Sequence, residues 1–194
     1  MIAVPTRQPA ERPAKHIPGE EGIWVLIFGD MVVFAIFFVT FLVYKAGNPA
    51  AYEADQVLLN PHLGLLNTLL LLTSSLFMAQ AVRLARLGAK EAPAMITATI
   101  VLGLGFVVVK AFEWGEKIRA GLTLTHSEFF TYYYMFTGIH LMHVLIGLGL
   151  LLWLRSGCKP SEQYPVATFE GCGVFWHLVD LLWVVLFALL YLMK

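Results

Sequence analysis

The sequence predicts an all-α fold, a polytopic membrane bundle of five transmembrane helices. Among its 194 residues, 59% are hydrophobic and only 13% are charged, and the mean hydropathy is +0.74. Soluble domains carry roughly a quarter of charged residues, so this composition indicates an integral membrane protein. The apolar residues fall into five runs, and each run has about the 20 residues that a helix needs to cross a bilayer.

Residues 1–21 precede the first run and contain four prolines and several charges. They lack the apolar core of a signal peptide, so they are expected to form a flexible cytoplasmic tail. The first span is expected over residues 22–44, and it ends before Lys45, which Gly47 and Pro49 follow as stop signals. No internal repeat divides the remainder, so residues 22–194 are expected to form one domain.

Capping signals place the second and third spans. Asn60 provides an N-cap and Pro61 a first-turn proline for a span over residues 62–85. Pro93 opens the third span, which is expected over residues 94–114. Proline suits a first helical turn because its missing N–H would have no partner within the helix.

The fourth and fifth spans complete the bundle. Thr125, with Glu128 three residues later, forms a capping-box pattern for a span over residues 128–155. The last apolar run predicts a span over residues 172–193. Five crossings place the two termini on opposite sides of the membrane.

The basic residues predict which way the chain crosses the membrane. One side has the larger share of them: Arg7, Arg12, Lys15, Arg83, Arg86, Lys90, Arg155 and Lys159. The other side has Lys45, Lys110, Lys117, Arg119 and Lys194. Because loops rich in Lys and Arg stay in the cytoplasm, the N-terminus is predicted to be cytoplasmic and the C-terminus periplasmic. The formal net charge of +0 gives no reason to expect a nucleic acid as partner.

Two histidines near the middle of the fourth span are the first candidate functional residues. His140 and His143 share a face at i, i+3, and Gly147 continues that face one turn on, so another helix can approach closely there. An imidazole in hydrocarbon needs a polar partner. The partners of these rings are expected on other helices.

Acidic residues at membrane depth are the second set. Asp30 lies about eight residues into the first span, roughly 12 Å at 1.5 Å per residue, and the fifth span carries His177 and Asp180 at i, i+3. A carboxylate at this depth costs a few kcal/mol, so it is expected to be protonated or paired with a histidine. Glu113 closes the third span with Lys110 and Lys117 on its side, and this group is interpreted as a solvated helix end with snorkelling lysines.

Three interpretations of these polar residues stay open at this point. They can be structural, fixing helix register through interhelical hydrogen bonds, or they can handle protons. The third interpretation is metal or haem ligation, in which His140 or His143 faces His177. Cys158 and Cys172 lack the paired spacing of a zinc site and are expected to be plain thiols.

Four stretches of the chain resemble subunit III of the haem-copper oxidase superfamily, the cytochrome c oxidase subunit III-like family. The first is Gly29-Asp30 followed by residues 34–38, and the others are residues 110–116, 137–147 and 175–183. The resemblance extends over nearly all of residues 22–193, with a departure at Leu141, where the family usually has a second glycine. Residues 59–68 and 109–113 are most similar to the NorE-type branch that is associated with nitric oxide reductase.

The resemblance implies an accessory subunit without a redox centre, in a bacterial inner membrane. It implies packing on a catalytic subunit that carries haem and copper or non-haem iron, binding of phospholipid, and support of proton uptake and stability. The family's long form has seven spans and a lipid-filled cleft, whereas five spans are typical of the quinol-oxidase subunit III. The resemblance also implies that Asp30 pairs with His140. Two alternatives remain: a self-contained haem protein that uses its intramembrane histidines, and a proton or small-solute transporter.

Overall fold

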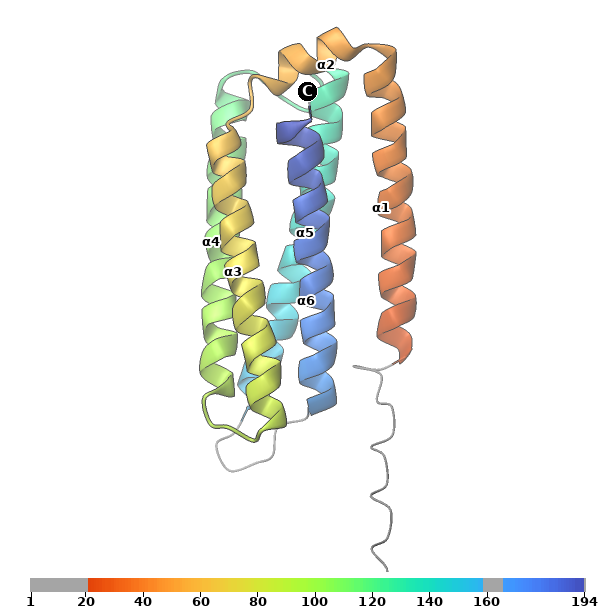
Figure 1. Cartoon of the computed structure of the whole chain (residues 1–194). Coiled ribbons are helices and arrows are strands. Elements are labelled where there is room, and N and C mark those ends of the chain that lie inside the picture. Colours follow the sequence, from red (N-terminus) through yellow and green to blue (C-terminus); the bar gives the residue numbers. More distant parts are fainter. Residues whose placement is uncertain (1–20, 159–165, 194) are drawn as a thin grey trace, which may run out of the picture.

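The computed structural model describes residues 21–158 and 166–193, and within these ranges it contains helices and no strand (Figure 1). The predicted tail therefore lies outside the described residues except for Glu21, as do Lys159 and Lys194. Within the part of the chain that the structure describes, five helices are long and apolar enough to cross a membrane. The predicted all-α fold with five spans is confirmed.

The long helices extend beyond the predicted spans. They are α1 (Glu21–Gly47), α3 (Pro61–Arg86), α4 (Ala92–Arg119), α5 (Glu128–Gly157) and α6 (Val166–Phe187), and α6 continues into the π-helical turn η1 (Ala188–Leu192). The largest differences are at the end of α4, five residues beyond the predicted Trp114, and at the start of α6, six residues before Cys172. Hydropathy locates the membrane-crossing part, whereas the helix continues while its backbone and packing permit.

Two helix starts test the predicted caps. At α3 the Asn60 side chain accepts a hydrogen bond from the His62 N–H, with Pro61 in the first turn, as predicted. At α5 the predicted Thr125 cap is wrong, because Ser127 is the N-cap and its hydroxyl accepts from the Phe130 N–H. Glu128 is therefore the first residue of α5, too early in the helix for a capping box.

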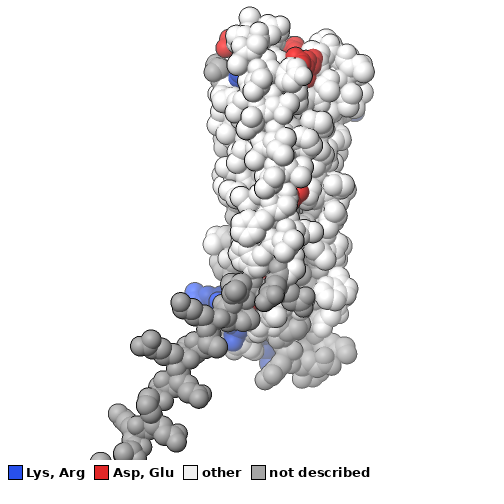
Figure 2. Space-filling view, turned by 90° about the vertical axis from the view of Figure 1, so that its right-hand side faces the viewer, with Lys and Arg blue, Asp and Glu red and all other residues white. Residues whose placement is uncertain are grey.

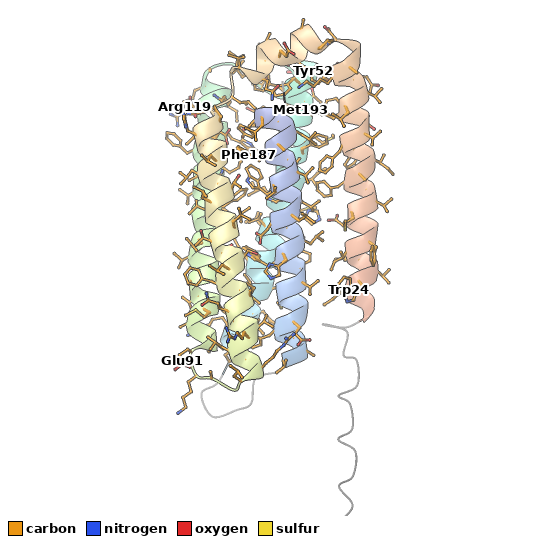
Figure 3. The ribbon with its side chains drawn as sticks, in the orientation of Figure 1. Trp24, Tyr52, Glu91, Arg119, Phe187 and Met193 are labelled. Atoms are coloured by element: carbon orange, nitrogen blue, oxygen red, sulfur yellow. The ribbon has the colours of Figure 1, made fainter. Side chains whose placement is uncertain are left out.

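A short helix that the sequence analysis missed, α2 (Pro49–Gln56), lies across one end of the bundle above the C-terminal end of the chain (Figure 1). Pro49 was interpreted as a stop signal, but proline also suits the first turn of a new helix. The Lys45 ammonium of α1 donates to the Met193 carbonyl and to Gln56 Oε1. Figure 3 shows Tyr52 and Met193 together at this end and Trp24 at the other.

The helices α3, α4, α5 and α6 form a bundle, and α1 stands beside it (Figure 1). The centre of the bundle contains the buried indoles of Trp176 and Trp183 on α6, which donate to the hydroxyls of Ser74 and Thr68 on α3. Helix α1 packs Phe34 against α6 near Leu178. Figure 2 looks onto the side of the molecule where α1 lies and shows charged residues at both ends of a broad band that is almost free of charge.

Candidate functional site

The six predicted site residues do not meet at a single point. Asp30 contacts His143, Glu113 contacts Lys110 and Tyr191, His177 contacts Ser75 and lies near Asp180, and His140 lies apart. The six residues therefore fall into three polar clusters and one isolated imidazole.

The first cluster joins α1 to α5. His143 Nε2 lies 3.2 Å from Asp30 Oδ1, and His143 Nδ1 lies 2.8 Å from the Ile139 carbonyl oxygen. A carbonyl only accepts, so Nδ1 must carry a hydrogen. Nε2 then faces the Asp30 carboxyl group across the boundary between α5 and α1. The pair is thus a polar contact that joins two membrane-spanning helices.

Asp30 therefore pairs with His143 and not with His140, which corrects the partner that the family resemblance implied. Three residues turn an α-helix by about 300°, so the two rings diverge by about 60° around α5. That angle directs His143 toward α1, where the Phe34 ring meets it edge-on, and directs His140 toward Phe106 of α4 and Trp183 of α6.

His140 is fully buried, and neither ring nitrogen has a hydrogen-bond partner among the described residues. The ring centroids of Phe106 and Trp183 lie 5.5 and 5.2 Å from that of His140. An imidazole in such surroundings fills space between aromatic rings. The expectation of a polar partner is wrong for this residue, because nothing in the sequence marked the facing residues as aromatic.

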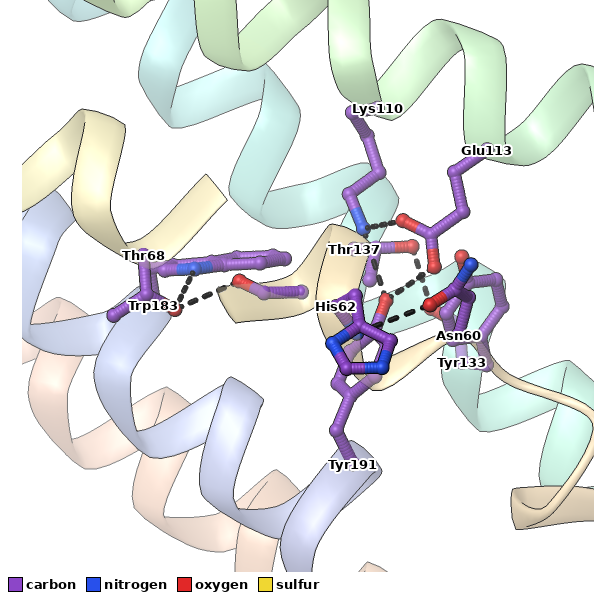
Figure 4. A network of polar contacts seen from close by, with 10 residues as sticks. Asn60, His62, Thr68, Lys110, Glu113, Tyr133, Thr137, Trp183 and Tyr191 are labelled. Atoms are coloured by element: carbon purple, nitrogen blue, oxygen red, sulfur yellow. Dashed lines mark hydrogen bonds and ion pairs between the residues drawn. The ribbon is translucent and has the colours of Figure 1, made fainter. Parts of the chain in front are cut away.

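The second cluster is a buried ion pair with a phenol (Figure 4). Lys110 Nζ donates to Glu113 Oε2 at 2.7 Å, and the Tyr191 hydroxyl donates to Glu113 Oε1 at 2.6 Å. Lys110 and Glu113 are 0% exposed. The ammonium also lies 4.6 Å from the centroid of the Trp183 ring, within cation–π range. Each charged group thus has a hydrogen-bond partner away from solvent.

The interpretation of Glu113 as part of a solvated helix end is wrong. Helix α4 continues to Arg119, so Lys110 and Glu113 lie inside the bundle, and Tyr133 of α5 and Tyr191 cover them. Tyr191 belongs to the π-helical turn and is a site residue that the sequence analysis missed. A tyrosine near the end of a span is typical of the membrane interface, so its position gave no signal of this contact.

The third cluster lies between α3 and α6. The Ser75 hydroxyl is 2.5 Å from His177 Nδ1, and Asp180 Oδ2 is 3.8 Å from the same nitrogen. The Asp180 side chain is 6% exposed and the His177 side chain 43%. Neither carboxylate oxygen of Asp180 accepts a hydrogen bond from a described residue.

These contacts bear on the haem interpretation. His143 is engaged by α1, and His177 is engaged by Ser75 of α3, so the two rings have different partners. Among the described residues there is no group of three or more His, Cys, Asp and Glu side chains that could hold a metal ion. Cys158 and Cys172 are free thiols.

A groove between α1, α5 and α6 leads to the first cluster. It consists of two adjoining cavities of about 430 and 380 Å³ that share Leu26, Ile146 and Phe175. The first cavity is lined mainly by apolar side chains, including Leu150 and Trp153, and the lining of the second includes Asp30 and His143. The residues that line one or both cavities are Ile23, Val25, Leu26, Gly29, Asp30, Val33, His143, Ile146, Leu150, Trp153, Ala167, Thr168, Gly171, Cys172 and Phe175. The Asp30–His143 pair therefore opens onto an apolar groove.

Comparison with known proteins covers nearly the whole chain. A family model described as cytochrome c oxidase subunit III matches residues 18–194. The cytochrome c oxidase subunit 3 of Bacillus sp. (strain PS3) is 32% identical over 178 residues, which cover 89% of this chain and 84% of that protein. The quinol oxidase subunit 3 of Bacillus subtilis is 30% identical, over 89% of this chain and 85% of that protein. The heme-copper oxidase subunit I+III of Aeropyrum pernix is 30% identical over 88% of this chain and 22% of that protein.

Proposed function

Because the chain belongs to the cytochrome c oxidase subunit III family, we propose that it serves as an accessory membrane subunit of a haem-copper-type respiratory complex and packs against the catalytic subunit. The observation that carries the proposal is the extent of the family match, which includes all five spans. The Aeropyrum pernix relative supports this partner, because its name joins subunits I and III in one chain. In this proposal haem, with copper or non-haem iron, belongs to the catalytic subunit and not to this chain.

The reaction of the complex, reduction of oxygen or of nitric oxide, then takes place in the catalytic subunit. Similarity to the NorE-type branch favours a nitric oxide reductase and stays a prediction, since the relatives above are named as cytochrome c and quinol oxidases. The predicted location of the protein is a bacterial inner membrane. Mass spectrometry of the chains that co-purify with this one would identify the catalytic subunit and with it the reaction.

Purification in mild detergent tests the accessory role. The tagged chain is expected to bring down a haem-bearing subunit, and the isolated chain is expected to show no Soret band. A Soret band in the isolated chain that disappears in His143→Ala would favour the self-contained haem protein instead. Ion flux into liposomes that contain this chain alone would favour the transporter. Absence of any haem-bearing partner would contradict the proposal.

Support of proton uptake is a second proposed role, favoured by the contact between Asp30 and His143, two ionisable side chains at membrane depth. Proton uptake by the complex during turnover, followed with a pH-indicator dye, should fall in Asp30→Asn. Glu116→Gln is the matched control, because the Glu116 side chain lies on the same chain but is 51% exposed. An equal rate of uptake in wild type and Asp30→Asn would exclude this role.

Phospholipid binding is proposed for the groove between α1, α5 and α6, because its lining is mainly apolar. Ile146→Trp should fill the groove and reduce the lipid retained by the purified subunit, as counted by native mass spectrometry. Leu152→Trp is the control on the same helix, since Leu152 is exposed and does not line the groove. Equal lipid retention in the two variants would show that the groove does not hold the lipid.

A further inference from the structure

We propose that the catalytic subunit docks on the face of the bundle around His177, through a membrane-spanning helix that places a hydrogen-bonding side chain opposite this ring. The docking face is defined here by Ser75 and Ala79 of α3 and by Val174, His177 and Leu181 of α6. The inference rests on the proposed function, which states that a catalytic subunit binds, and it adds where the subunit binds and by which chemistry.

Helix α6 has only a narrow free side. In its most apolar stretch 67% of the residues are buried, against 17% in α1. The exposed residues from His177 to the first residue of η1 recur at helical spacing and form one stripe: His177, Leu181, Val184 and Ala188, with half-buried Val174 before them. The stripe is otherwise apolar, so His177 is a single polar group in the middle of an outward-facing surface.

The depth of His177 makes its exposure costly. It lies eleven residues after Val166 and fifteen before Leu192, so it is roughly 17 Å along the helix at 1.5 Å per residue. His177 therefore lies near the middle of the hydrocarbon core of the membrane, which is about 30 Å thick. With 43% of its side chain exposed, the ring would face acyl chains, which offer no hydrogen bond.

The His177 ring has one nitrogen to offer a partner. Nδ1 is engaged by the Ser75 hydroxyl and lies near Asp180 Oδ2, which leaves Nε2 for a group outside the chain. The side of the ring that faces the protein is thus occupied by Ser75 and Asp180, whose side chain is 6% exposed.

The surface next to the ring fits a helix. A cavity of about 200 Å³ lies between α3 and α6, with His177 at one end and the Arg86–Glu170 ion pair at the other. The small side chain of Ala79 is exposed and lines it, and small residues let a second helix approach closely. A helix that docks at this cavity can thus approach α3 closely and form a polar contact with His177.

A lipid fits this face less well than a protein helix. Its phosphate could reach Arg86, but its acyl chain would then lie along His177 and leave Nε2 without a partner. The outer surface of α4 lacks this problem, because the exposed residues along its middle, Val101, Leu104 and Val108, are apolar. Lipid therefore suits α4, and a protein partner with a hydrogen-bonding group suits the docking face.

Photo-crosslinking in the assembled complex tests the location. A benzophenone amino acid at Leu181, on the docking face, should crosslink to the haem-bearing subunit, whereas the same probe at Val108 of α4 should not. Crosslinking from Val108 but not from Leu181, or a Leu181 product that contains lipid only, would overturn the proposed face while leaving the accessory role in place. Failure of the chain to co-purify with any haem-bearing subunit would overturn the proposed function and the docking face with it.

Two substitutions test the chemistry. A hydrogen bond between membrane helices typically changes affinity by about three- to fifteenfold. The Kd of this chain for the catalytic subunit should therefore rise by about that factor in His177→Leu, and the diluted complex should dissociate at a correspondingly higher protein concentration than the wild-type complex. His177→Gln should restore much of the affinity because the amide can still form a hydrogen bond. The thermal melt of the isolated subunit separates docking from folding: if His177→Leu lowers the melting temperature and leaves release from the complex unchanged, the residue is structural and the docking role is wrong.

Discussion

The contacts of His143 differ from those of His140 although three positions separate them. His143 donates to a carbonyl of its own helix and contacts Asp30 of α1, whereas His140 is enclosed by aromatic rings and has no hydrogen-bond partner among the described residues. The two residues look equivalent in sequence. Their different roles follow from the angle between them and from which helix each faces.

A double-mutant cycle checks this difference. Asp30→Asn and His143→Ala should each lower the free energy of unfolding, because each leaves its partner without its main contact, and the double mutant should be milder than the sum by about 1–3 kcal/mol. The same cycle with His140→Ala in place of His143→Ala is the control and should be additive. The measurement is unfolding of the detergent-solubilised subunit. Additivity in the first cycle and coupling in the second would contradict the assigned pairing.

A larger loss of stability is predicted when the Lys110–Glu113 ion pair is broken. Both side chains are 0% exposed, and removal of one member of a buried pair typically costs about 3–5 kcal/mol because the other charge stays buried. Lys110→Met and Glu113→Gln should each destabilise the subunit by about that amount, and Lys110→Met/Glu113→Leu by much less.

Lys117→Met is the control on the same helix. Lys117 donates to the Leu58 carbonyl near the end of the bundle, so its loss should cost about the 1.5–3 kcal/mol of a hydrogen bond from a charged group, without leaving a buried carboxylate behind. Chemical denaturation of the four variants in one detergent gives the comparison. Equal effects of Lys110→Met and Lys117→Met would mean that Lys110 is hydrated.

Among the helices, α6 organises the packing because its two tryptophans reach the neighbouring spans. The Trp176 indole is fully buried and lies against the glycines of two other helices. A Cβ at Gly147 of α5 would approach Trp176 to 2.8 Å, and a Cβ at Gly103 of α4 would approach it to 2.9 Å. A close approach of another helix was predicted at Gly147, and what lies against this glycine is the Trp176 indole with the Phe175 ring of α6.

Glycine substitutions on α5 test this packing. Gly147→Ala should destabilise the bundle by about 1–3 kcal/mol, since the indole is held by its hydrogen bond to Ser74 and cannot move without strain. Gly149→Ala is the matched control, because a Cβ there has nothing within 4 Å, and it should be neutral or stabilise by about 0.5–1 kcal/mol. Thermal melts of the two variants decide the matter. A destabilisation by Gly149→Ala as large as that by Gly147→Ala would indicate an effect on the helix itself.

At the scale of the molecule, hydropathy and capping signals were sufficient to predict five spans, because crossing a bilayer imposes length and composition on each segment. They were insufficient for the site. Which residues pair depends on how each helix is rotated against its neighbour, and this rotation brings Asp30 to His143. The burial of Glu113 depends on Tyr191, which lies 78 positions away along the chain, so tertiary packing rather than a local sequence pattern determines it. Helix α2 was missed because proline both ends and begins helices.

The orientation of the molecule is a prediction that Cys158 can test. This thiol lies just after α5, at the end of the bundle that is predicted to be cytoplasmic. Ala54 on α2 is exposed at the opposite end, so Ala54→Cys supplies a thiol on the predicted periplasmic side. A maleimide that cannot cross the inner membrane distinguishes the two ends in cells with a permeabilised outer membrane.

In such cells the reagent should label Ala54→Cys in a Cys158→Ser background, and it should leave Cys158 of the wild-type chain unlabelled until the inner membrane is disrupted. Burial raises the pKa of the Cys158 thiol, and Arg155 opposes this effect in part. The thiolate is the reactive form, so after disruption Cys158 should react more slowly than the introduced cysteine at neutral pH and faster as the pH rises toward its pKa. Because Cys158 is expected to react slowly at neutral pH, the disrupted sample is also labelled at higher pH, and this sample is the reference for complete labelling of Cys158. Labelling of Cys158 before disruption, with protection of Ala54→Cys, would place the C-terminus in the cytoplasm and reverse the predicted orientation.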